Sequence, residues 1–128
     1  MLIVALVASL GVAMMRGTGR GELKALALDA ADLIRRERLG AVLTGRPREV
    51  FIDGESRTLS GDGRKTVRIP ADVMLDLIGT DASAGRRLVV RFEPDGSSSG
   101  AALRVSRDRF GYEIRVNWYT GGVAIVEP

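Results

Sequence analysis

Apolar residues fill the first fifteen positions of the chain almost without interruption, and the first charge is Arg16. A secretory signal peptide explains the run poorly, because nothing basic precedes it and Met14-Met15-Arg16 is not a small-residue cleavage site. A buried helix usually keeps a polar stripe, whereas this run is apolar all round. As a helix it spans about 22 Å, short of the roughly 20 residues that a membrane needs. The pattern predicts a truncated transmembrane helix over 1–15, with these anchoring residues: Leu2, Ile3, Val4, Leu6, Val7, Leu10 and Val12.

Glycines and basic residues follow this run. Gly17, Gly19 and Gly21 each weaken a helix by about 1 kcal/mol relative to alanine, so we expect a bend or break there. The basic residues are Arg16, Arg20 and Lys24. Because basic flanks normally stay in the cytoplasm, these residues taken alone would place the rest of the chain inside the cell.

From residue 22 to 44 the pattern is that of an amphipathic helix. Its apolar stripe consists of Leu23, Leu26, Ala27, Ala30, Leu33, Ile34 and Ala41. Its charged face consists of Asp29, Asp32, Arg35, Arg36 and Glu37. Gly45 and Pro47 then form a stop signal. Residues 16–45 are therefore expected to form a hinge and one helix whose apolar stripe packs on the rest of the chain.

Residues 46–128 alternate between strand-like runs and turn signals. The runs are EVFID, SRTLS, KTVRI, VMLDLIG, RRLVVRF, AALRVSR, YEIRVNW and VAIVE. Such alternation predicts antiparallel strands with one face on the core and the other in water. The fold class that follows is α+β, one long N-terminal helix packed on antiparallel β-sheet.

Two of these runs predict specific faces. In RRLVVRF, alternation places Leu88, Val90 and Phe92 on one face and Arg87, Val89 and Arg91 on the other. In YEIRVNW, the core face holds Tyr112, Ile114, Val116 and Trp118, and the wet face holds Glu113, Arg115 and Asn117. We therefore expect Trp118 to pack in the core, in preference to serving as an exposed stacking platform for bases.

Composition narrows the chemistry. The 128 residues include no Cys and no His, which excludes disulfides and removes the commonest general base. The run EPDGSSSG is favoured as a hairpin loop, because Pro-Asp-Gly is a turn sequence. Its alternatives are an anion held by the serine hydroxyls or a calcium ion bound by Asp95. We expect no catalysis, no cofactor, no metal and no small-molecule substrate.

The charge balance is mildly basic. The net charge is +3, and residues 86–115 hold seven Arg against four acidic residues. A solvated basic face explains this excess better than phosphate binding does. The candidate DNA-contacting residues, should the face bind nucleic acid, are Arg104, Arg107, Arg109 and Arg115.

The C-terminal third carries a resemblance. The segment RFEPDGSSSGAALRVSRDRFGYEIRVNWYTGGVAIVEP resembles the end of the minor pseudopilin H family of type II secretion (GspH-type, which includes FimT/FimU-like minor pilins). The matching residues are Phe92, Pro94, Asp95, Gly96, Ser97, Val116, Trp118, Thr120 and Gly121. The helix end, RRERLGAVLTGRP, also resembles the family's Arg-rich exit.

The resemblance implies a pilin-like fold and a structural role without catalysis. It implies a single pass through the bacterial inner membrane, a periplasmic β domain over 46–128, and other minor and major pseudopilins as partners. Met1 would correspond to the sixth mature residue, so the basic leader, the processing Gly, the methylated Phe and the assembly Glu would precede the chain. That leader would also place basic charge on the cytoplasmic side.

Two further functions remain open at this stage. A FimT/FimU-like type IV minor pilin would contact DNA during uptake through the basic face, which makes nucleic acid a partner under that alternative alone. A membrane-anchored periplasmic enzyme using Asp or Glu has no support beyond isolated carboxylates.

Overall fold

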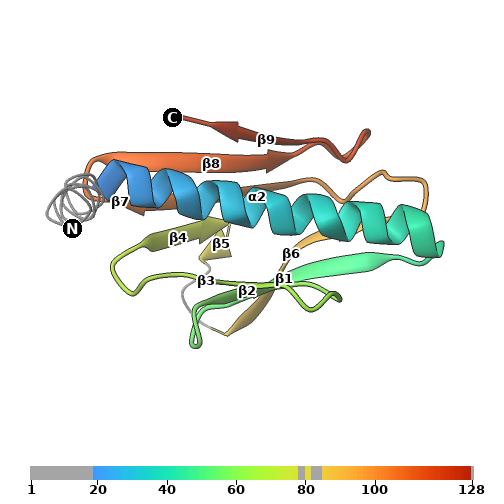
Figure 1. Ribbon diagram of the computed structural model, residues 1–128, viewed down its shortest axis with the longest axis horizontal. Coiled ribbons are helices and arrows are strands. Elements are labelled where there is room, and N and C mark those ends of the chain that lie inside the picture. Colours follow the sequence, from blue (N-terminus) through green and yellow to red (C-terminus); the bar gives the residue numbers. More distant parts are fainter. Residues whose placement is uncertain (1–18, 78–79, 82–84, 128) are drawn as a thin grey trace, which may run out of the picture.

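One long helix lies across two antiparallel sheets (Figure 1). The computed structural model describes residues 19–77, 80–81 and 85–127. The transmembrane helix expected over 1–15, with its anchoring side chains, lies outside the described residues. Within the described part, no helix is long and apolar enough to span a membrane.

Helix α2 (Gly19–Thr44) confirms the predicted amphipathic helix. Every residue of the predicted apolar stripe is buried, with Leu33 and Ile34 at 1% and 0% exposure. Gly19 and Gly21 both lie within the described helix, so the break expected around the glycines is not seen at Gly21. Gly45 ends the helix with a φ of 69°, and its N–H donates to the Ala41 carbonyl at 3.0 Å.

The first sheet has the strand order β3-β2-β1-β6. Its strands are β1 (Arg48–Asp53), β2 (Thr58–Ser60), β3 (Thr66–Arg68) and β6 (Arg86–Phe92). The second sheet has the order β5-β4-β7-β8-β9. Its strands are β4 (Met74–Leu77), β5 (Thr80–Asp81), β7 (Ala101–Arg107), β8 (Phe110–Val116) and β9 (Val123–Val126). All of the strand pairs are antiparallel, as the alternation predicts.

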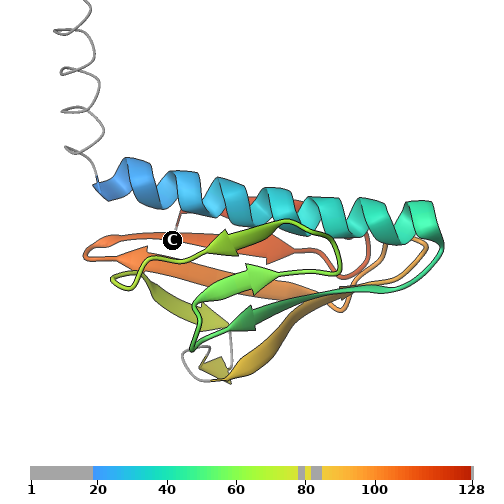
Figure 2. The ribbon, with the colours of Figure 1, turned by 60° about the horizontal axis from the view of Figure 1, so that its bottom comes forward.

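The core lies between the helix and the inner faces of both sheets (Figure 2). The helix packs against β8, β9 and β7 of one sheet and against β1, β3 and β6 of the other. The large side chains at its centre include Phe92, Ile52, Leu59, Leu103 and Ile114. A single helix that covers two sheets confirms the α+β, pilin-like architecture for the described residues.

The predicted faces of β6 are wrong at two positions. Leu88 is 45% exposed, whereas Val89 is 6% exposed and joins the core. The β1–β6 register shifts between Val50 and Phe51, and this bulge turns the strand by one residue. Val90 and Phe92, beyond the bulge, are buried as expected.

Two carboxylates expected in water are buried. Glu37 of α2 is 4% exposed and accepts hydrogen bonds from the backbone N–H groups of Asp62 and Gly63, at 3.2 and 2.9 Å. The guanidinium of Arg48 lies 3.4 Å from the same carboxylate. Glu113 is 2% exposed and lies under arginines of its own sheet. Both carboxylates tolerate burial because each is paired and hydrogen-bonded.

Candidate functional site

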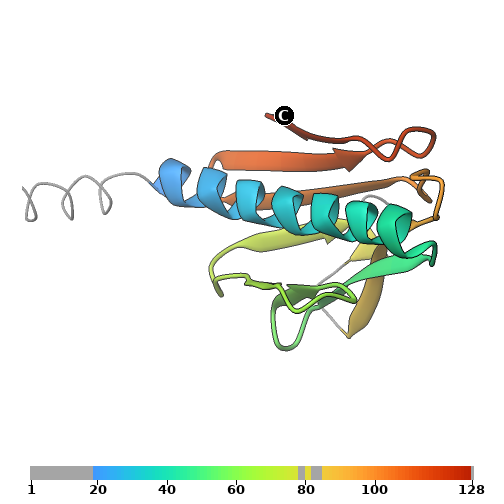
Figure 3. The ribbon, with the colours of Figure 1, turned by 45° about the vertical axis from the view of Figure 1, so that its right-hand side comes forward.

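The residues that carry the family resemblance come together at one end of α2. The loop between β6 and β7 and the loop between β8 and β9 lie side by side where the helix ends (Figure 3). Gly96 and Gly121 meet at this contact, and a Cβ atom on Gly121 would overlap the Gly96 carbonyl oxygen. Both glycines have positive φ, at 90° and 71°, which L side chains rarely adopt.

Arg38 of α2 fastens both loops to the helix. Its Nε atom donates to the Gly96 carbonyl at 3.1 Å and to the Thr120 carbonyl at 3.2 Å. One turn earlier, the Arg35 guanidinium donates to the Val123 carbonyl at 3.0 Å. We call Arg38 and the two loops, residues 93–100 and 117–122, the loop clamp.

Each loop of the clamp is also fixed by its own side chains. The Asp95 carboxylate accepts from the hydroxyl and the N–H of Ser97, at 2.6 and 2.9 Å. These bonds hold the pKa of Asp95 below its usual value. In the second loop, Asn117 Oδ1 accepts from the N–H groups of Tyr119 and Thr120, at 2.8 and 3.0 Å.

The aromatic residues next to the two loops differ in burial. Phe92, at the end of β6, is fully buried, and it forms an isolated bridge with Ser98. The expectation that Trp118 packs in the core is wrong, because Trp118 is 67% exposed. Strand β8 ends at Val116, so the alternation that predicted its burial stops two residues earlier.

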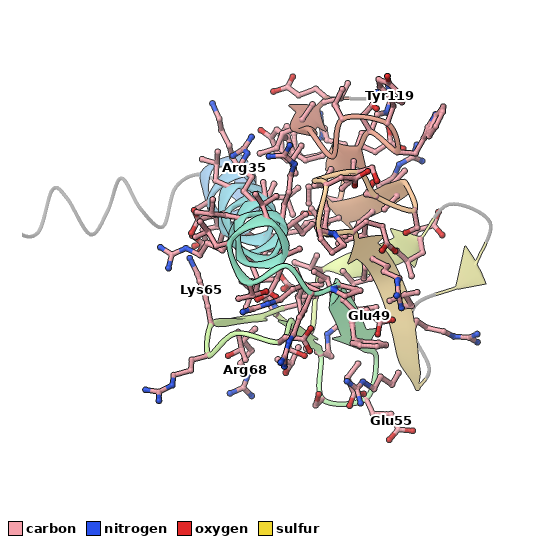
Figure 4. All side chains as sticks on the ribbon, turned by 90° about the vertical axis from the view of Figure 1, so that its right-hand side faces the viewer. Arg35, Glu49, Glu55, Lys65, Arg68 and Tyr119 are labelled. Atoms are coloured by element: carbon pink, nitrogen blue, oxygen red, sulfur yellow. The ribbon has the colours of Figure 1, made fainter. Side chains whose placement is uncertain are left out.

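Sequence reasoning did not identify three residues of the site, namely Arg38, Asn117 and Tyr119. Arg38 lies in the Arg-rich helix end, but only its distance to two carbonyls shows its role. Asn117 and Tyr119 lie in the loop of the hairpin motif. The Trp118 and Tyr119 rings form a T-shaped pair with centroids 5.6 Å apart. Tyr119 is 73% exposed and lies on the rim of the molecule away from the helix that carries Arg35 (Figure 4).

The structure brings two of the four candidate DNA-contacting arginines together, Arg104 and Arg115, at the Glu113 carboxylate. Arg104 and Arg115 lie 3.9 and 2.7 Å from the Glu113 carboxylate. Arg107 donates to Glu22 at 2.8 Å and to Asp72 at 2.9 Å. Arg109 is exposed in the turn between β7 and β8. Three of the four arginines therefore form ion pairs with neighbouring carboxylates.

Among the described residues, no group of three or more Asp or Glu side chains converges. The arrangement they do contain is a rigid pair of loops that presents two aromatic rings. Such an arrangement suits contact with another macromolecule.

Comparison with known proteins supports the fold. No protein-family model matches the sequence, and no curated protein matches it either. The chain is similar in structure to the minor pseudopilin EpsH of the type 2 secretion system of Vibrio cholerae. The TM-score is 0.66 at 13% identity over 84% of this chain and 98% of that one.

A second similar structure is the type IV minor pilin FimU of Pseudomonas aeruginosa. Its TM-score is 0.65 at 13% identity, over 85% of this chain and 94% of that one. Another crystal form of FimU gives a TM-score of 0.58 at 12% identity, over 83% and 97%. From Gly19 onward, the fold of this chain is that of the minor pilins and pseudopilins.

Proposed function

We propose that this chain is a minor pseudopilin, a structural subunit of a type II secretion pseudopilus without catalytic activity. The observation that carries the proposal is the helix laid across two antiparallel sheets, which aligns with EpsH over 84% of the chain. The clamp adds support, because Gly96, Thr120 and Gly121, three of the residues that resemble the GspH-type family, lie where its two loops join.

In this proposal the chain has three parts. Residues 1–15 form the membrane-embedded part of the N-terminal helix in the bacterial inner membrane. Residues 16–45 lead out of the membrane, and residues 46–128 form the periplasmic domain. The partners are other minor and major pseudopilins, which would contact the exposed side of α2 and the loops at its end.

The alternative is a type IV minor pilin, which the likeness to FimU supports at almost the same TM-score, 0.65 against 0.66. Contact with DNA would then fall mainly to Arg109 and to any arginine that exchanged its carboxylate for a phosphate. Such binding would weaken steeply with salt, because each phosphate contact releases counterions. We place this alternative second, since Arg104, Arg107 and Arg115 already have acidic partners.

Deletion of the gene in its own host distinguishes these functions. Loss of secreted enzymes from the medium, with surface pili and DNA uptake intact, is the result that we expect, and a plasmid copy restores secretion. Loss of pili or of DNA uptake with intact secretion would favour the alternative. Unchanged secretion, piliation and DNA uptake would refute both functions.

A further inference from the structure

Strand β6 is an edge strand of the first sheet, and part of its outer backbone edge has no partner strand among the described residues. Among the described strands it pairs with β1 alone. The loop after β6 folds back over its C-terminal end, where Ser99 N–H donates to the Arg91 carbonyl at 2.9 Å. The stretch from Arg86 to Val90 has no such cover from the described residues. An open edge of this kind is a template for a further strand.

A groove runs beside this open stretch. One wall is formed by Arg87, Leu88 and Val89 of β6, and the other is formed by the small residues 100–102 at the start of β7. The groove has a volume of about 330 Å³, at the lower end of the range for ligand-binding clefts. Leu88, turned outward by the β-bulge, gives the groove an apolar anchor point.

Trp118 of the loop clamp lies next to Gly100, at one end of the groove. Gly100, which lines the groove, packs so closely on Trp118 that a Cβ atom would lie 3.2 Å from the Trp118 Cβ. Asn117 already holds the backbone that carries Trp118 in place. Contact between a partner and the Trp118 ring would therefore lose little conformational entropy in this loop. Exposed Trp and Tyr side chains are the commonest anchors of binding surfaces.

The positive charge of β6 favours a partner segment with acidic side chains. Arg86, Arg87 and Arg91 are exposed, and the strand contains no acidic residue. Arg91 is partly neutralised by Glu93 at 2.9 Å, and the Arg86 guanidinium lies over the Phe51 ring. Pairing β6 with a second copy of itself would set arginine against arginine, and basic residues on an edge commonly prevent such pairing. A segment with acidic side chains would find complementary charge instead.

We propose that the open edge of β6 binds an extended segment of a partner protein, rich in acidic and apolar side chains, which adds to the sheet as a further strand. Backbone hydrogen bonds to β6 would supply affinity. The apolar side chains would pack on Leu88 and on Trp118, and the acidic side chains, on the other face of the added strand, would pair with Arg87. The inference does not depend on whether the chain serves secretion or a pilus.

The test uses the full chain in detergent solution and a capped six-residue peptide of alternating Glu and Val. Binding should slow hydrogen exchange of backbone amides in residues 86–90. Two peptides are methylated, one on the Glu nitrogens and one on the Val nitrogens, and one of the two should bind about tenfold or more weakly, because only alternate N–H groups of an added strand donate to β6. The variant Arg87→Glu should weaken binding by a similar factor of about ten, whereas Arg64→Glu, in an exposed loop elsewhere, should leave it unchanged.

Four results would overturn the proposal. A Lys-Val peptide that binds as well as the Glu-Val peptide would remove the charge selection, and undiminished binding of both N-methylated peptides would remove strand addition. A short single-stranded DNA that binds through Arg87 while the peptide does not would reassign the edge to nucleic acid. Dimerisation of the chain that protects residues 86–90 would make a second copy the occupant. Circular dichroism of each variant confirms that it has folded before binding is compared.

Discussion

Trp118 is the residue at which the pattern and the fold disagree most. With 67% of its surface exposed, its fluorescence should resemble that of tryptophan in water, and iodide should quench it strongly. Its replacement by Ala should cost less than about 1 kcal/mol, as for other surface positions. A blue-shifted emission that iodide does not quench would contradict the exposed position.

Gly121 should be the most sensitive glycine of the loop clamp. Gly121→Ala would combine an unfavourable φ of 71° with overlap on the Gly96 carbonyl and an approach of 2.6 Å to Arg38 Nε. Gly45→Ala is the matched control, because Gly45 has a φ of 69° and no neighbour within 4 Å of the new Cβ. We expect about 1–2 kcal/mol for the control, from φ alone, and clearly more for Gly121→Ala in urea denaturation. Equal costs would show that the two loops separate easily.

At the scale of the element, α2 is held by its buried stripe. Ile34 is fully buried against the sheets, so Ile34→Ala should lower the free energy of unfolding by about 2–5 kcal/mol. Leu43 lies on the same helix with 74% of its surface exposed. Leu43→Ala should cost within about 0.5 kcal/mol, and chemical denaturation of both variants provides the comparison.

Arg38 connects the helix to both loops, so its removal should loosen those loops more than the rest of the fold. Arg38→Ala removes its hydrogen bonds to the carbonyls of Gly96, which is part-buried, and Thr120, which is exposed, at a cost of about 0.5–1.5 kcal/mol. Hydrogen exchange of residues 93–97 and 117–122 should become faster, while β7 keeps its protection. Arg36→Ala is the control, since Arg36 is 64% exposed and pairs with Asp32 on the helix surface. Equal exchange in both variants would remove the role given to Arg38.

At the scale of the whole molecule, three aspartates couple stability to acid. The Lys65 ammonium lowers the pKa of Asp32, the Glu55 backbone N–H lowers that of Asp53, and the Ser97 hydroxyl lowers that of Asp95. A lowered pKa in the folded state means that the unfolded chain binds more protons. The stabilisation is therefore complete above the ordinary aspartate pKa of about 3.9 and is lost as the pH falls through the folded values.

Urea denaturation between about pH 5 and pH 2 should show this loss of stability. The triple variant Asp32→Asn, Asp53→Asn, Asp95→Asn should flatten the decline, because it removes the carboxylates that titrate. If the wild type and the triple variant decline with the same slope, other groups control the acid sensitivity.

The sequence by itself determined the local structure. The stripe from Leu23 to Ala41 defines α2, and alternation places Tyr112, Ile114 and Val116 on the inner face of β8. These features are readable because periodicity reports which side of its own element a residue occupies. The Asp-Gly turns are readable for a similar reason, since the short side chain bonds its own backbone.

Only the tertiary structure decided which faces of the helix, the strands and the loops pack against one another. The β-bulge at Val89 of β6, formed against β1, exposes Leu88 and buries Val89, and no pattern within RRLVVRF shows where the extra residue falls. Glu37 is buried because the loop at Asp62 and Gly63, 25 and 26 residues later, folds over it. The two loops of the clamp, and the open edge of β6 beside them, depend on strand order in two sheets. Strand order follows from how all elements share one core, which no single segment of the sequence encodes.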